Sequence, residues 1–330
     1  MQPQYETFRF PAHDGTSLVG WHNNGDGPTV IVCNGLCVPP EAWPRLLDPN
    51  CGYRVFGWNH RGSLGSDKPD DLTRIRVEDH TDDAFALMDH VGVDRALLVA
   101  WSIGVNVSFE VARRDPDRVA GMLMCAGVPG ATLESAFAPL LVPKPLRKPL
   151  SLAVIHAGKA IGGQLNFLAR LLPTGRPLAE VLRHGRLVMP WARNEDLIPW
   201  LRSFSQHDFA WYFHMFPAAG EHERVDPSFI ECPITVAAGG FDTLTSMLDV
   251  VAFAKQIDHA QIHVLHGTHL IPLEFPDEIL AMLDGVLAQS DLADERVAAP
   301  HDAPIDIHRL DGEVVFEHST QPVAYASLAG

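Results

Sequence analysis

Short apolar segments alternate with amphipathic segments over the first 130 residues, and this alternation constrains the fold more than any other feature of the chain. The apolar runs are 29–33, 53–58, 96–100 and 119–125. Between them, 77–92 and 105–116 place apolar residues at helical intervals. Apolar strands joined by amphipathic helices are typical of βαβ units around a parallel sheet. The sequence therefore predicts an α/β fold with a mostly parallel central sheet flanked by helices.

The alternation lapses between residues 128 and 232, where helix-like segments are interrupted by Pro and Gly and no clear apolar strand occurs. Strands return at 233–240 and 260–267, and 276–289 has the pattern of a final helix. We therefore predict one α/β core interrupted by a helical cap or lid. The predicted parts are core 1–127, cap 128–232, core 233–290, and a linker with a hairpin-like arm at 291–330, where Asp311-Gly312 is a turn signal.

The charge of the chain limits its partners. A net charge of −16 argues against nucleic acid, because phosphate binding needs a basic face. The charge is uneven: residues 131–230 hold 11 Lys+Arg and 8 Asp+Glu, a net of +3, which leaves 14 minus 33, or −19, for the rest. The mildly basic segment could face an anionic or lipid-like substrate, and a chance difference in solvated side chains is the alternative. The basic stretch 144–148 could touch a membrane surface, although a solvated edge of the cap is the favoured interpretation.

The chain shows no targeting or membrane-spanning segment. Its N-terminus lacks the basic and apolar regions of a signal peptide, and no run reaches the roughly 18 apolar residues of a membrane helix. We therefore expect a cytoplasmic protein without an integral membrane segment. The five cysteines lack metal-ligand spacing and are predicted to be mostly buried free thiols.

A single hydroxyl stands where the apolar run 96–100 gives way to a helix-like segment. Ser102 lies in the strand-to-helix junction AWSIG (100–104). The small residues Ala100 and Gly104 stand two positions before and two positions after it. One interpretation is a helix N-cap, for which Ser is a favoured residue. The other is a nucleophile on a strained turn, where crowding between strand and helix requires small neighbours.

Two later residues favour the nucleophile. A nucleophilic Ser needs a His base, and that His needs an orienting carboxylate. Asp242 follows the strand at 233–240, and His269 follows the strand at 260–267. Both lie at carboxyl ends of strands, where α/β sheets gather their ligands. Ser102, Asp242 and His269 are therefore the predicted catalytic residues.

Acyl transfer also needs backbone donors for the oxyanion. The N–H of Ile103 is one candidate, because it begins a helix beside the nucleophile. The turn Asn34-Gly35-Leu36 after the first predicted strand supplies the other, with Leu36 N–H the first choice and Cys37 N–H the second. Cys37, Trp101 and Leu270 are the tentative residues of the substrate pocket.

Five short motifs carry a resemblance to a known family: NGL (34–36), RGSLGSD (61–67), AWSIG (100–104), GGFD (239–242) and GTHLIPLEFP (267–276). With them, the chain resembles the serine hydrolases of the α/β-hydrolase fold, esterases and lipases with a helical lid. Three residues depart from the family pattern: Asn34 replaces a frequent His, Ala100 replaces the first Gly of the nucleophile motif, and Thr268 replaces the Gly before the catalytic His. The nucleophile is Ser and not Asp, which argues against epoxide hydrolases and haloalkane dehalogenases of this fold.

The resemblance implies a cofactor-independent hydrolase that cleaves a carboxylic ester, or a thioester, with an apolar part. A C–C bond hydrolase, a perhydrolase or a lyase with the same triad is the alternative. A ligand receptor or scaffold without activity is the alternative from another class. We expect a small-molecule substrate and no metal: His263, His266 and His269 are spaced three apart but have no acidic or Cys cluster beside them. The C-terminal arm could serve an oligomer.

Overall fold

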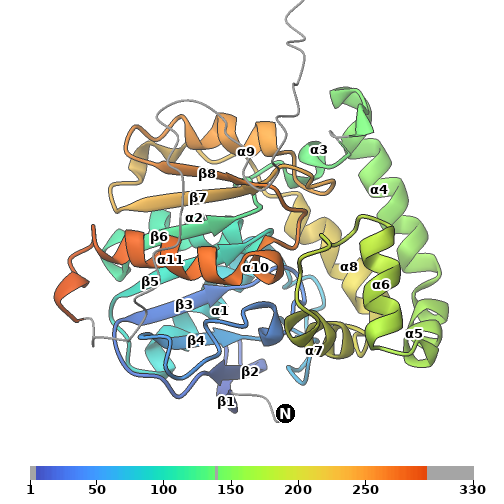
Figure 1. The fold of residues 1–330 in the computed structure, drawn as a ribbon. Helices are drawn as coiled ribbons and strands as arrows, with labels where there is room; N and C mark the ends of the chain where they lie inside the picture. Colours follow the sequence, from blue (N-terminus) through green and yellow to red (C-terminus); the bar gives the residue numbers. More distant parts are fainter. Residues whose placement is uncertain (1–4, 138–139, 296–330) are drawn as a thin grey trace, which may run out of the picture.

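The computed structural model describes residues 5–137 and 140–295. Within these residues, eight strands form one sheet in the order β1-β2-β4-β3-β5-β6-β7-β8 (Figure 1). Their bounds are β1 (Glu6–Pro11), β2 (Ser17–His22), β3 (Thr29–Cys33), β4 (Arg54–Trp58), β5 (Ala96–Trp101), β6 (Val119–Cys125), β7 (Ile234–Gly239) and β8 (Gln261–Leu265). All pairings from β4 to β8 are parallel, whereas β1–β2 and β2–β4 are antiparallel.

The sequence pattern predicts six of these strands to within two residues and misses the N-terminal hairpin. Strands β1 and β2 are joined by a tight turn in which Gly15 N–H donates to Ala12 C=O at 2.9 Å, with Gly15 at a φ of +83°. In β1 only Phe10 is buried. This edge strand therefore lacks the continuous burial that marks β3, β5, β6 and β7.

Side chains on the two faces of the sheet pack into two separate apolar clusters. Val30, Val32, Leu97 and Val99 pack with α10 (Ile271–Glu274) and α11 (Pro276–Leu287). Their sequence neighbours, such as Ile31 and Leu98, pack on the opposite face with α1 (Val77–His90), α2 (Gly104–Arg114) and α9 (Met247–Ala254). Burial with a period of two on both faces is what helices covering both sides of a parallel sheet require.

In the described part of the chain between β6 and β7 there are six α-helices, and we call this segment the insertion. They are α3 (Thr132–Ser135), α4 (Lys144–Ala160), α5 (Gly162–Leu171), α6 (Arg176–His184), α7 (Asn194–Phe204) and α8 (Phe209–Gly220). Helices α4 to α8 lie together on one side of the sheet (Figure 1). Short 3-10 helices complete the described chain: η1 (Pro40–Ala42), η2 (Pro116–Arg118), η4 (Pro227–Phe229) and η5 (Ala293–Glu295). The predicted hairpin at 305–318 lies outside the described residues.

A buried guanidinium ties the turn after β4 to α1. Arg61 is 1% exposed, and its Nε and Nη2 donate to the two carboxylate oxygens of Asp83 at 2.9 and 2.7 Å. Its Nη1 donates to Asp14 in the β1–β2 turn. The fork of Arg61 therefore joins three segments that are distant in the sequence.

Four of the five cysteines are buried, Cys232 is half-buried, and all five are free thiols. Burial raises the pKa of Cys33 and Cys37 to about 12 each. None of the helices in the described ranges has the length and apolarity needed to cross a bilayer.

Candidate active site

Ser102 lies on a strained turn between β5 and α2. Its φ is +56°, in the left-handed region that side chains other than Gly rarely adopt. Its N–H donates to Cys125 C=O in β6 at 2.9 Å. A Cβ at Gly104 would overlap the carbonyl oxygen of Cys33, so the small residue in the sequence motif is required by the crossing of α2 over β3. Such strain is typical of functional sites.

The structure brings Ser102, His269 and Asp242 into one hydrogen-bonded chain. His269 Nε2 lies 2.9 Å from Ser102 Oγ, and His269 Nδ1 lies 2.7 Å from Asp242 Oδ2. The three residues follow β5, β8 and β7, whose carboxyl ends meet at one edge of the sheet.

Asp242 is held by further hydrogen bonds. Its Oδ1 accepts the N–H groups of Leu244 and Thr245, each at 2.8 Å, and its side chain is 1% exposed. A carboxylate only accepts hydrogen bonds, so His269 carries its proton on Nδ1 and offers the Nε2 lone pair to the Ser102 hydroxyl. An imidazole in such an arrangement can accept a hydroxyl proton.

Glu274 fixes the loop that carries His269, a role that the sequence analysis did not assign. Its Oε2 accepts Thr268 N–H at 2.7 Å, and its Oε1 accepts the Thr268 hydroxyl and Met189 N–H, each at 2.8 Å. Burial raises the pKa of this carboxyl group. Met189 belongs to the insertion, so one side chain joins the insertion to the His269 loop.

The three tentative pocket residues have different surroundings. Trp101 packs against the imidazole of His269, with ring centroids 5.6 Å apart, and its indole N–H donates to His269 C=O at 2.8 Å. Leu270 is half-buried, and its N–H donates to the Thr268 hydroxyl. Cys37 is buried, with its sulfur 3.9 Å from that of Met215 in α8. Trp101 therefore contacts both the ring and the backbone of His269 and helps to hold this loop in place.

The turn after β3 lies beside Ser102. Asn34 folds this turn, because its Nδ2 donates to Val38 C=O and its Oδ1 accepts the indole N–H of Trp43. A Cβ at Gly35 would lie 3.6 Å from that of Ser102. In the described chain, the N–H groups of Leu36 and Ile103 have no acceptor. Both predicted oxyanion donors are thus unengaged within the protein.

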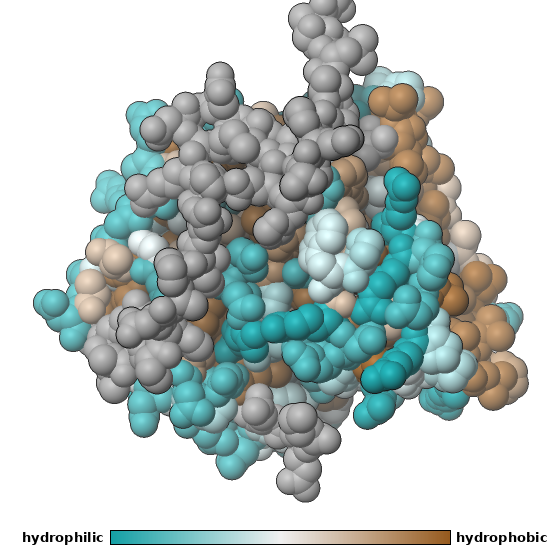
Figure 2. All heavy atoms as spheres, in the orientation of Figure 1, coloured by the Kyte–Doolittle hydropathy of each residue, from teal (hydrophilic) through white to brown (hydrophobic). Residues whose placement is uncertain are grey.

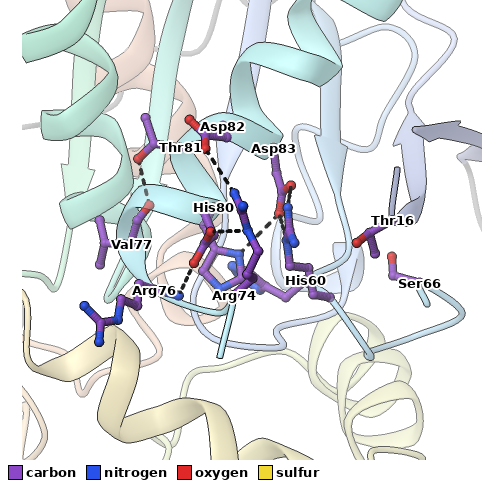
Figure 3. Close-up of polar contacts among 12 residues, drawn as sticks. Thr16, His60, Ser66, Arg74, Arg76, Val77, His80, Thr81, Asp82 and Asp83 are labelled. Atoms are coloured by element: carbon purple, nitrogen blue, oxygen red, sulfur yellow. Dashed lines mark hydrogen bonds and ion pairs between the residues drawn. The ribbon is translucent and has the colours of Figure 1, made fainter. Parts of the chain in front are cut away.

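A histidine that the sequence analysis did not single out holds this turn in place. His60, directly after β4, accepts Cys37 N–H on Nδ1 at 3.0 Å. The second choice for an oxyanion donor is therefore already engaged. Figure 3 draws His60 together with His80 and its neighbours in α1; the His60 and His80 ring centroids are 4.6 Å apart. Burial, and then the neighbouring His80 and His207, lower the pKa of His60 well below its usual value. His60 is therefore neutral and able to accept.

A third apolar cluster joins the turn to the insertion. Leu36, Cys37 and Ile103 pack with Trp211 and Met215 of α8, and Ile75 completes the cluster. The indole N–H of Trp211 donates to Arg61 C=O at 2.8 Å. Trp211 and Met215 of α8 thus pack with Leu36 and Ile103, the two residues predicted to supply the oxyanion donors.

The three histidines spaced three apart do not converge. His266 contacts the rings of Trp191 and Phe241, His263 is buried in β8, and His269 bonds to Asp242. Within 5–137 and 140–295, no group of three His, Cys, Asp or Glu side chains is placed to hold a metal ion.

Comparison with known proteins agrees with this architecture. A family model described as alpha/beta hydrolase fold matches residues 28–149. The chain is 25% identical over 124 residues to AB hydrolase superfamily protein YfhM of Bacillus subtilis, which is 37% of this chain and 43% of that protein. It is 31% identical over 99 residues to epoxide hydrolase A of Mycobacterium tuberculosis, which is 29% of this chain and 30% of that protein.

Similarity of structure extends further along the chain. The enol-lactonase of Burkholderia xenovorans superposes with a TM-score of 0.64 at 20% identity, over 84% of this chain and 99% of that chain. At this identity the structural likeness shows the fold alone. The chain spans less than half of the length of these two curated relatives. By its sheet order, its family model and these likenesses, the chain has the α/β-hydrolase fold.

Proposed function

We propose that the chain is a cofactor-independent serine hydrolase that cleaves a carboxylic ester, or a thioester, with an apolar part. The hydrogen-bonded chain from Ser102 through His269 to Asp242 carries this proposal. A capping Ser would need neither the histidine nor the two unengaged N–H groups beside it.

In the proposed reaction, Ser102 Oγ attacks the ester carbonyl carbon while His269 Nε2 takes the hydroxyl proton. The N–H groups of Leu36 and Ile103 bind the oxyanion. The C–O bond then breaks, and His269 returns the proton to the departing alcohol, leaving an acyl group on Ser102. Water, deprotonated by His269, attacks this acyl group and releases the acid and the free enzyme.

The preference for an apolar substrate part rests on the cluster beside Ser102. Leu36 and Ile103 pack against Trp211 and Met215, so an acyl or alcohol group near the oxyanion donors meets apolar side chains. Ser102 at the nucleophile position also separates the chain from epoxide hydrolases of this fold, despite the partial likeness to one of them.

The proposal is tested by hydrolysis of p-nitrophenyl esters from acetate to palmitate, together with labelling by a fluorophosphonate, which requires an activated serine. We expect stoichiometric labelling on Ser102 and turnover of at least part of the series, with the preferred chain length reporting the size of the pocket. Labelling without ester turnover would favour C–C hydrolysis or another triad reaction. A protein that resists the fluorophosphonate and all esters would instead be a receptor or scaffold.

His60 is expected to position the oxyanion-binding turn through Cys37. Asn and Leu side chains have the same number of heavy atoms and the same branching, but only Asn offers an acceptor near the position of Nδ1. We expect His60→Leu to lower kcat for the best ester about 10–100-fold with little change in KM, less than the 10²–10³-fold typical of a lost oxyanion donor. His60→Asn should recover most of this loss. Equal activities in the two variants, at equal melting temperatures, would exclude the role.

A further inference from the structure

Helices α4 and α5 present a broad apolar surface that nothing in the described chain covers. On α4, Leu146, Leu150 and Val154 are 57%, 39% and 48% exposed. On α5, Phe167 and Leu171 are 65% and 64% exposed. Figure 2 shows this surface as a hydrophobic band along the side of the molecule occupied by these helices. We call it the α4–α5 face.

The opposite side of α4 is already used for packing. Ser151, Ile155 and Gly158 recur at helical spacing and are buried. A Cβ at Gly158 would press against the ring of Phe213 in α8, so α4 approaches α8 closely there. Surface helices of soluble proteins are normally apolar on the packed side and polar on the other. In α4 the outward side is apolar as well, and packing within the chain does not account for it.

The charge of this segment is one-sided. From Ser135 to Ala179 the sequence contains no Asp or Glu, although the whole chain has 41 of them. The same segment contains six cations: Lys144, Arg147, Lys148, Lys159, Arg170 and Arg176. Four of these, Lys144, Lys148, Arg170 and Arg176, are exposed and form no ion pair within the described residues. The apolar face is thus surrounded by unneutralised positive charge on an otherwise acidic protein.

We propose that the α4–α5 face docks the protein on an anionic lipid surface. Exposed Leu, Val and Phe side chains at helical spacing can enter the region between headgroups and acyl chains, while Lys and Arg extend to the headgroup phosphates. Anionic headgroups attract such clusters of cations. A symmetric contact between two copies would instead bring two acid-free, cationic segments together, which like-charge repulsion disfavours. The docking is peripheral and places the insertion, but not the sheet, in contact with lipid.

The test is sedimentation of the full chain with vesicles, and it needs no substrate. One set of vesicles is pure phosphatidylcholine, and the other contains one third phosphatidylserine. We expect binding to the mixed vesicles, at least 10-fold weaker binding to the neutral ones, and a loss of binding as salt is raised. Failure to bind either set would refute the proposal and leave the proposed hydrolase activity untouched.

Variants locate the surface. Leu150→Ser with Phe167→Ser removes apolar contact, and Lys148→Glu with Arg170→Glu reverses charge, all at exposed positions. Each pair should lower vesicle binding at least 10-fold without changing the melting temperature. Leu248→Ser is the control, because Leu248 is 71% exposed but lies on α9. Unchanged binding in both pairs would place the lipid contact elsewhere. A dimer in solution that the Leu150/Phe167 pair converts to monomer, without lipid binding, would identify the face as an interface between copies.

Discussion

Replacing Ser102 with alanine is expected to lower kcat for the best ester at least about 10⁴-fold, because no other group can form the acyl intermediate. The residue is half-buried on the turn between β5 and α2, where Ala fits without new contacts. The melting temperature should therefore stay close to that of the unchanged protein. Steady-state kinetics and fluorophosphonate labelling of the same preparation measure both effects.

Asp242→Asn is the second arm of this experiment. The Asp242 carboxylate accepts hydrogen bonds from His269 and from two backbone N–H groups, whereas the Asn amide has only one acceptor oxygen. The imidazole then loses its working tautomer, and kcat should again fall about 10⁴-fold. Ser205→Ala is the matched control for the serine variant, since the Ser205 hydroxyl donates to Arg202 C=O at the carboxyl end of α7. A Ser102→Ala protein that retained a tenth of the activity would exclude the serine mechanism.

Replacing Arg61 with leucine is expected to lower the free energy of unfolding by about 3–5 kcal/mol, the usual cost of removing one partner from a buried ion pair. Asp83 is fully buried and would keep a carboxylate without its cation. Urea denaturation measures the change. Arg224→Ala is the control: Arg224 pairs with Glu134 at the surface, where such pairs contribute less than about 1 kcal/mol. Equal losses in the two variants would contradict the assignment.

The same cluster gives stability a dependence on acid. Burial alone would raise the pKa of Asp14, but hydrogen bonds from Arg61 and Thr16 outweigh it and lower the pKa from 3.8 to about 2. A lowered pKa in the folded state stabilises the protein above the unfolded value. This contribution is therefore complete at neutral pH and is lost as the pH falls from about 4 towards 2. In Arg61→Leu this part of the acid sensitivity should be reduced.

The sequence predicts the central strands well because their burial requires an uninterrupted run of mostly apolar residues. Strands β3 and β5 are buried on both faces, so every residue but Thr29 is apolar and the run stands out. The turn at Ser102 can also be recognised from the sequence, because α2 crosses β3 at a point where only a Gly fits, and Gly104 stands there. Strand β1 gives almost no such signal, because one buried Phe10 in six residues does not differ from a loop.

Residues that act across the fold were beyond the reach of a local pattern. His60 and Cys37 are 23 positions apart and meet only because β3 and β4 are neighbours in the sheet. Glu274 is close to His269 in sequence, yet its bond to Met189 joins positions 85 residues apart. A polar residue directly after an apolar strand was the available signal for His60, as it was for Asp242.

The bonds of Glu274 have a consequence for attempts to exchange parts between related proteins. One buried carboxylate accepts hydrogen bonds from both Met189 N–H and Thr268 N–H. The connector between α6 and α7 therefore helps to position the loop that carries the His269 imidazole. A chimera with a foreign insertion inherits this carboxylate but not its backbone donor. Such a chimera can fold and still hold the His269 loop loosely. An exchanged insertion must therefore place a backbone N–H group where Met189 N–H now meets Glu274.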